Sequence, residues 1–155
     1  MEWMILPFKR YADFTGRSRR KEYWMFFLLN TIITLVLLVP PIVVIFGALV
    51  ETAVSGSGRD TDAFFDEVGP VVWGTLVLYL IYSLASFIPS LALGVRRFHD
   101  RGITGWAYGG LYAGSLVLTP LVGFAILVIA ALPGDQGPNQ YGPAPLDPYD
   151  EDIFA

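Results

Sequence analysis

Hydrophobic residues along this chain gather in three long segments that contain no Asp, Glu, Lys or Arg. These segments are residues 23–50, 68–95 and 102–134. Each is longer than the roughly 20 apolar residues that a helix needs to cross a hydrocarbon core about 30 Å thick. A surface helix of a soluble protein has a polar face, and these segments have almost none. The pattern therefore predicts an all-α, polytopic membrane protein rather than a soluble domain with buried helices.

The first two segments each have the length of one complete span. The first span is expected to run from about Tyr23 to between Pro40 and Val50, because a proline pair at this point ends or kinks a helix. The second span is expected at about residues 71–95. Residues 51–67 carry five acids and one Arg between these spans, and their Gly, Ser and Asp content predicts a polar loop.

The third segment is too long for one ordinary span. Its 33 residues, 102–134, would form a helix of about 50 Å. Thr119, Pro120 and Gly123 supply turn-forming residues near its middle. A helical hairpin is therefore favoured, and a single long tilted helix is the alternative.

Small and polar residues at helical spacing predict where the helices contact one another. On the second span, a stripe of such residues comprises Ser83, Ser86, Ser90 and Gly94. Gly110 and Gly114 form a GxxxG pair that favours close helix packing, and Asn30 is expected to hydrogen-bond another helix.

The two ends of the chain differ from the apolar segments. Residues 1–14 combine Trp, Phe and Tyr with charges and predict a short interfacial helix. The last ten residues, 146–155, are acidic and predict a disordered tail. The predicted architecture is thus a single membrane domain, 1–145. It is a small helical bundle of about four hydrophobic helices, two of them full spans and two in a C-terminal hairpin.

The distribution of positive charge predicts the orientation of the chain. Of ten Lys and Arg residues, residues 1–22 hold six, residues 96–101 hold three, and the acidic loop holds one. Loops rich in Lys and Arg stay on the cytoplasmic side. The N-terminus and residues 96–101 are therefore expected in the cytoplasm, and residues 51–67 on the external side of the membrane. The hairpin would return the tail to the cytoplasm, whereas a single span would place it outside.

Several kinds of chemistry have no candidate residues. The chain has no cysteine and only one histidine, His99, which excludes thiolate and multi-histidine metal sites. There is no zinc motif, nucleophile elbow or phosphate loop. We therefore expect no enzyme activity, cofactor or metal. Nucleic acid is not an expected partner, because the basic cluster directly adjoins a membrane span.

Charged residues at the expected cytoplasmic helix ends form a candidate cluster. Its members are Arg17, Arg19, Arg20, Glu22, Arg96, Arg97, His99, Asp100 and Arg101. One interpretation is structural: Glu22 pairs with Arg96 or Arg97, and Asp100 caps the next helix or accepts a bond from His99.

The other interpretation is that positive charge in excess of the acids binds an anionic lipid headgroup or a phosphorylated ligand. In that case the bilayer is the partner, with anionic lipid as the ligand, or the cluster organises protein partners at the cytoplasmic face. A small-solute transporter or channel subunit is the alternative function, although no ionisable residue lies mid-membrane as transport usually requires. The sequence does not give the oligomeric state.

Three motifs resemble a known family. They are YADFTGRSRRKEYWMFF near the start, SLALGVRRFHDRGITGW in the middle and PGDQGPNQYGP near the end. Their order and spacing resemble the bacterial inner-membrane family catalogued as domain of unknown function 805, over roughly residues 3–145. The chain departs from the family pattern at Ala107, where a second tryptophan is usual, and at Gln140, where Arg or Lys is usual. The resemblance implies a small multi-spanning inner-membrane protein and supplies no reaction.

Overall fold

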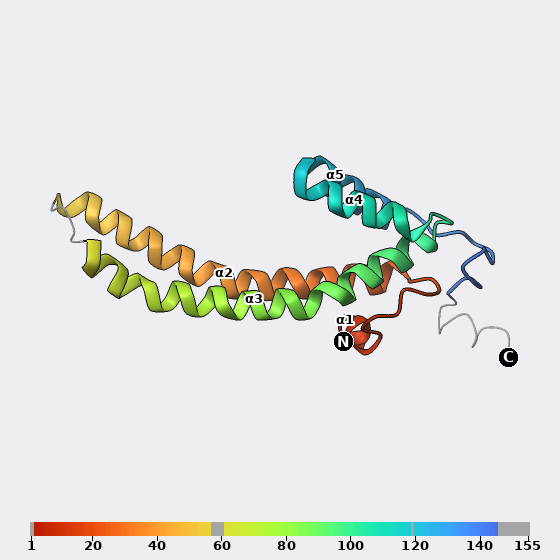
Figure 1. The fold of residues 1–155 in the computed structure, drawn as a ribbon, viewed down its shortest axis with the longest axis horizontal. Coiled ribbons are helices and arrows are strands. Elements are labelled where there is room, and N and C mark those ends of the chain that lie inside the picture. Colours follow the sequence, from red (N-terminus) through yellow and green to blue (C-terminus); the bar gives the residue numbers. More distant parts are fainter. Residues whose placement is uncertain (1, 57–60, 119, 146–155) are drawn as a thin grey trace. The chain divides into compact units, whose positions relative to one another are not determined.

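The computed structural model describes residues 2–56, 61–118 and 120–145, and the regular elements in these ranges are five α-helices (Figure 1). They are α1 (Glu2–Lys9), α2 (Arg20–Ser55), α3 (Thr61–His99), α4 (Gly105–Leu118) and α5 (Pro120–Ala131). The predicted all-α class is confirmed. The predicted disordered tail, 146–155, lies outside the described residues, and the domain boundary at residue 145 stays a prediction.

The chain divides into two compact units. The first unit contains Met1–Phe27 and Phe87–Ala155, and the second contains Leu28–Ser86. Helices α2 and α3 each run through both units. Both helices are long and apolar enough to cross a membrane.

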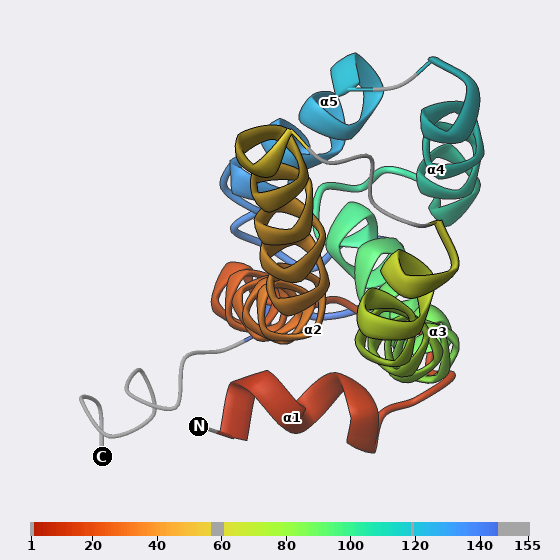
Figure 2. The ribbon, with the colours of Figure 1, turned by 90° about the vertical axis from the view of Figure 1, so that its left-hand side faces the viewer.

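In the second unit, α2 and α3 lie side by side (Figures 1 and 2). The hydroxyl of Tyr82 on α3 donates a hydrogen bond of 2.9 Å to Oδ1 of Asn30 on α2. This bond confirms the predicted contact of Asn30 with another helix. It gives both polar groups a partner on a face that would otherwise meet lipid.

The two long helices extend beyond the predicted span limits. Of the two effects expected of the Pro40–Pro41 pair, an end or a kink of the helix, the end is wrong, because α2 passes through both prolines. A membrane helix tolerates proline where neighbouring groups satisfy the freed carbonyls. The predicted loop 51–67 is also too long. Helix α2 continues to Ser55 and stops where Gly56 adopts a φ of 62°, a left-handed conformation typical of the residue after a helix.

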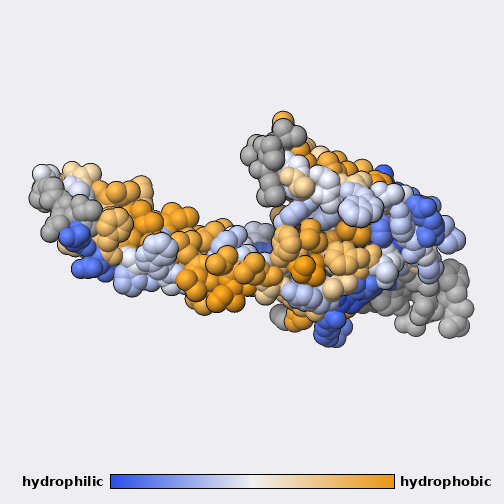
Figure 3. Space-filling view, in the orientation of Figure 1, coloured by the Kyte–Doolittle hydropathy of each residue, from blue (hydrophilic) through white to orange (hydrophobic). Residues whose placement is uncertain are grey.

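The surface of the second unit is largely hydrophobic (Figure 3). Large apolar side chains are widely exposed along its helices, including Phe46 at 67% and Leu84 at 65%. A water-soluble protein rarely leaves so much contiguous apolar surface uncovered. Lipid around α2 and α3 accounts for it, because these side chains then face hydrocarbon instead of water.

The first unit has a small core where α3, α4 and α5 meet. Phe98, Tyr108 and Ile126 form its buried centre. Gly94 lies under the ring of Tyr108, and any Cβ at this position would overlap that ring. On another side of the unit, Phe8 of α1 packs edge-on against Phe26 of α2, with ring centroids 5.3 Å apart.

Helices α4 and α5 form the predicted hairpin, and the single tilted helix is wrong. They are 14 and 12 residues long, or about 21 and 18 Å, which is short of a complete crossing. Pro120 is the first residue of α5, the helical position that proline favours, whereas Thr119 lies outside the described residues. The predicted close packing at Gly110 and Gly114 is not found within the described chain, where a Cβ at either position would meet nothing within 4 Å.

Candidate functional site

A buried carboxylate, Asp100, joins two arginines from different parts of the sequence. Asp100 directly follows α3 and is 4% exposed. Its Oδ1 accepts a bond of 2.9 Å from Nε of Arg17, and its Oδ2 pairs with Nη1 of Arg97. Burying a charge is costly unless it is paired and hydrogen-bonded. These three residues therefore depend on one another for charge compensation.

A second buried pair joins the start of α2 to the end of α3. Nη2 of Arg96 lies 3.2 Å from Oε1 of Glu22, and the other carboxylate oxygen of Glu22 accepts a bond of 2.8 Å from the Ser18 hydroxyl. Arg96 is fully buried. The predicted pairing of Glu22 with Arg96 is confirmed.

Backbone carbonyls from the end of α5 and from the segment after it complete this network. Arg17 donates to the carbonyls of Asp135 at 2.5 Å and Gly137 at 2.7 Å. Arg97 donates to the carbonyl of Ala130 at 3.0 Å and to that of Leu132. The two guanidinium groups thus connect the N-terminal segment, the end of α3 and the tail after the hairpin.

Gly134 makes the close approach of this tail possible. A Cβ at residue 134 would overlap the Asp100 carboxylate. The backbone of the next residue is anchored as well, since the amide of Asp135 donates to the carbonyl of Asp100 at 2.9 Å. Residue-level reasoning from the sequence missed Gly134. The only signal was its position in the third motif.

His99 does not pair with Asp100, and that prediction is wrong. Its Nδ1 lies 3.2 Å from the carbonyl oxygen of Gly16, and its ring stacks on Tyr141 with centroids 3.8 Å apart and planes 4° apart. The side-chain amide of Asn139 donates to the His99 carbonyl at 2.9 Å. Asp100 does not cap α4: among the described residues, the hydrogen bonds to its carboxylate come from Arg17 and Arg97, not from amides of that helix.

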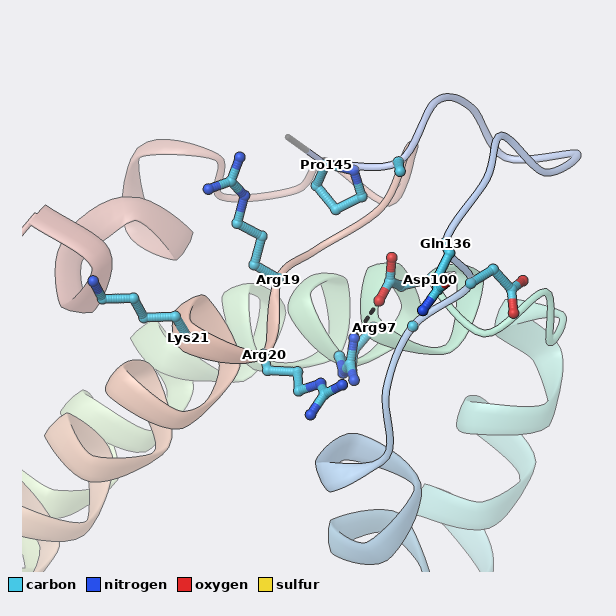
Figure 4. A pocket seen from close by; sticks show the side chains of 10 residues that line it. Arg19, Arg20, Lys21, Arg97, Asp100, Gln136 and Pro145 are labelled. Atoms are coloured by element: carbon cyan, nitrogen blue, oxygen red, sulfur yellow. Dashed lines mark hydrogen bonds and ion pairs between the residues drawn. The ribbon is translucent and has the colours of Figure 1, made fainter. Parts of the chain in front are cut away.

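A basic pocket of about 360 Å³ opens beside this network (Figure 4). Its charged lining comprises Arg19, Arg20, Lys21, Arg97, Asp100 and Asp135. The tail contributes Gly134, Gln136, Ala144 and Pro145 to the wall. Trp3 of α1 lies under two of the cations, with its ring centre 5.6 Å from Arg19 and 5.7 Å from Lys21.

The structure separates the nine candidate residues into groups. The buried network takes Arg17, Glu22, Arg96, Arg97 and Asp100. Each of the three arginines has a carboxylate partner, but Arg17 and Arg97 share Asp100, so the network keeps one positive charge in excess. Arg19 and Arg20 line the basic pocket together with Lys21, which was not among the candidates. Arg101 donates to the carbonyl of Pro133, and His99 lies apart from the basic pocket.

Metal ligands are not grouped in the described part of the chain. Among residues 2–56, 61–118 and 120–145, no three His, Cys, Asp or Glu side chains come together as a metal site requires. The cations that line the basic pocket can donate hydrogen bonds to an anion and attract its charge.

Comparison with known proteins assigns the family. Residues 11–143 match the family described as protein of unknown function (DUF805). The chain belongs to the DUF805 family. The match contains all three motifs, and hydrogen bonds of Arg17 join them: Arg17 of the first motif donates to Asp100 of the second and to the backbone carbonyl of Asp135 of the third.

Relatives of this DUF805 protein are inner membrane proteins. It is 33% identical to the inner membrane protein YhaI of Escherichia coli K12 over 149 residues, which cover 94% of this chain and 96% of YhaI. It is also 33% identical to the inner membrane protein YhaH of the same strain, over 96% of this chain and all of YhaH. No solved structure matches the chain. Together with its long apolar helices, these relatives place this DUF805 protein in the inner membrane.

Proposed function

We propose that this DUF805 protein binds the phosphate of anionic lipid headgroups at the cytoplasmic face of the inner membrane. The basic pocket would hold the phosphate, with Arg19, Arg20 and Lys21 as ligands. The buried network would be structural and would hold the pocket's walls in place. Catalysis has no part in this proposal.

The observation that carries the proposal is the excess of cations in the basic pocket. Four cations share its wall with two carboxylates. One of these carboxylates, Asp100, is already engaged by Arg17 and Arg97. Arg20 adds electrostatic repulsion to Arg97. An anion between such groups relieves this repulsion, and guanidinium groups bind phosphate through paired hydrogen bonds.

The position of the pocket favours lipid as the source of that anion. Three of its four cations lie at the start of the long apolar helix α2: Arg20 and Lys21 are its first residues, and Arg19 directly precedes it. A basic group near an anionic membrane surface contributes about 1 kcal/mol to lipid attraction. Trp3, which lies against two of these cations, is of the residue type that collects at the headgroup level.

The proposal requires the pocket to face the cytoplasm. Nine of the ten Lys and Arg residues lie in residues 1–22 and 96–101, and such loops stay inside. Arg17, Asp100 and Asp135 are bonded to one another, so the tail after the α4–α5 hairpin belongs to the same side as these basic segments. Residues 51–67 would then lie outside.

Native mass spectrometry of the purified protein with defined lipids tests the proposal. We expect phosphatidylglycerol to bind the unaltered protein more tightly than phosphatidylcholine does. Arg20→Gln should weaken phosphatidylglycerol binding about fivefold, the equivalent of about 1 kcal/mol. Lys9→Gln removes the same charge from an exposed site outside the pocket and is the matched control.

Two results would contradict this function. If both variants lost phosphatidylglycerol affinity equally, the binding would depend on general surface charge and not on the basic pocket. Competition by glycerol phosphate as effective as that of phosphatidylglycerol would identify a soluble phosphate compound as the ligand instead of a lipid.

A further inference from the structure

A second hollow in the first unit is chemically unlike the basic pocket. It has a volume of about 560 Å³, within the range of roughly 300–1,000 Å³ that is usual for small-molecule sites. Its lining is mainly apolar and aromatic, with Phe14, Trp106, Tyr108 and Tyr141 supplying rings. No charged side chain appears among its lining residues within the described chain. We call it the aromatic hollow, and nothing in the proposed lipid-phosphate function uses it.

His99 gives the aromatic hollow one specific polar group. The Gly16 carbonyl can only accept a hydrogen bond, so Nδ1 of His99, 3.2 Å away, must carry the hydrogen. In the neutral ring this leaves Nε2 as an acceptor. No residue in the described ranges hydrogen-bonds Nε2. Stacking on Tyr141 and the bond to Gly16 fix the ring, so the acceptor has a defined direction.

Gly105 keeps the space in front of this acceptor open. It lines the hollow as the first residue of α4, and a Cβ there would lie 3.1 Å from Nε2 of His99 and 2.6 Å from Cγ1 of Val95. Thr104, the preceding residue, also lines the hollow. A ligand group can therefore reach Nε2 past a residue without a side chain.

We propose that the aromatic hollow binds an uncharged, membrane-soluble phenol-type molecule whose aromatic hydroxyl donates a hydrogen bond to Nε2 of His99. The lack of charged lining argues against a phosphate or a carboxylate. The rings of Phe14, Trp106, Tyr108 and Tyr141 favour an aromatic ligand, because aromatic pairs gain energy beyond their buried area. Trp106 is 91% exposed beside the hollow, as expected where a ligand enters from the lipid.

Binding of two matched probes to the full-length protein in detergent tests this site. The probes are 4-pentylphenol and its methyl ether, 4-pentylanisole, which differ in the hydrogen-bond donor. We expect the phenol to bind about tenfold more tightly than the ether. The phenol hydroxyl donates a hydrogen bond to Nε2 of His99, whereas the ether would bury this acceptor without a partner. Dioctanoylglycerol, an aliphatic lipid with a hydroxyl, should bind less tightly than the phenol. Equal binding of phenol and ether, or tighter binding of dioctanoylglycerol, would overturn the proposal.

Two glycine variants test whether the phenol binds in the aromatic hollow. Gly109 lines the hollow, and a Cβ there would meet nothing within 4 Å, so Gly109→Leu fills the hollow without a clash at the backbone. We expect it to weaken phenol binding at least tenfold. Gly110→Leu is the matched control, since Gly110 is equally unobstructed but does not line the hollow. Equal effects of the two variants would contradict the site.

His99→Phe tests the acceptor itself. It keeps a ring over Tyr141 and removes Nε2, so the phenol and the ether should then bind equally. A preserved tenfold preference in a folded His99→Phe protein would overturn the role of His99. If this variant does not fold, the probe pair on the unaltered protein and the Gly109→Leu comparison still decide the proposal.

Phosphatidylglycerol binding at the basic pocket should be unchanged in Gly109→Leu, which separates this test from that of the lipid-phosphate function.

Discussion

At the scale of single residues, the buried ion pairs explain why charges stand next to apolar segments. Arg17, Arg97 and Asp100 are each less than a tenth exposed, and Asp100 pairs with both arginines. Backbone carbonyls of α5 and of the tail accept further bonds from the two guanidinium groups. Such a network adds little net stability when complete but is costly to break. Its main effect is to specify one arrangement of the segments that it joins.

Removing the shared carboxylate should therefore destabilise the first unit strongly. Asp100→Asn leaves two buried guanidinium groups without a carboxylate, and we expect a loss of about 3–5 kcal/mol in unfolding free energy. Denaturant unfolding in detergent measures this loss. Asp135→Asn is the control, because Asp135 is exposed and should change stability by less than about 0.5 kcal/mol. Similar losses in both variants would mean that the network is not what holds these segments.

Asp13, in the loop before the network, predicts a pH dependence. Its carboxylate accepts bonds from the hydroxyl of Thr15 at 2.6 Å and from the side chain of Arg10. These contacts lower the pKa of Asp13 from 3.8 to about 2, with the Thr15 hydroxyl as the largest cause. Because the pKa of Asp13 is lower in the folded protein, its ionised form stabilises the fold. This contribution to stability is complete above about pH 4 and is lost as the pH falls toward 2.

Carboxylate NMR of the folded protein in micelles checks this value. We expect the Asp13 resonance to titrate near pH 2 and to move to a higher pKa in Thr15→Val, which removes the hydroxyl donor. An Asp13 pKa close to 3.8 in the unaltered protein would contradict the described loop geometry.

At the scale of elements, contacts between helices depend on a few small residues. Gly94 allows the ring of Tyr108 to reach the backbone of α3, whereas Gly114 on α4 has open space around it. Gly94→Ala should cost about 1–3 kcal/mol by overpacking. Gly114→Ala is the matched control and should stabilise α4 by up to about 1 kcal/mol through helix propensity. Thermal unfolding of both variants measures the difference, and equal midpoints would contradict the packing of α4 on α3.

Most elements of the fold follow from the hydrophobic pattern alone. Charge-free segments predicted α2 and α3, and Pro120 predicted the break between α4 and α5. The pattern did not predict that α2 would continue to Ser55, because Glu51 ends the charge-free segment while nothing before Gly56 forces the helix to stop. The pattern also could not predict that Arg17 bonds to Asp100 and to Asp135. These partners lie 83 and 118 positions further along the chain, and local spacing says nothing about such distant contacts.

At the scale of the whole molecule, the chain combines long membrane-crossing helices with a polar network at their ends. The three family motifs, far apart in sequence, supply the charged residues of that network and most of the residues that line both hollows. One hollow is basic and the other aromatic, so the protein offers two different binding chemistries within the first unit. Lipid-phosphate binding at the cytoplasmic face requires the three motif segments to lie together on that side.

Labelling of single cysteines tests this sidedness most directly, because the natural chain contains no cysteine. Lys9→Cys, Asp62→Cys and Gln136→Cys each place one thiol at an exposed position. In intact spheroplasts, a membrane-impermeant maleimide should label only Asp62→Cys, and the other two should react only after lysis. Labelling of Gln136→Cys before lysis would put the tail outside and contradict the joint cytoplasmic placement of the three motifs.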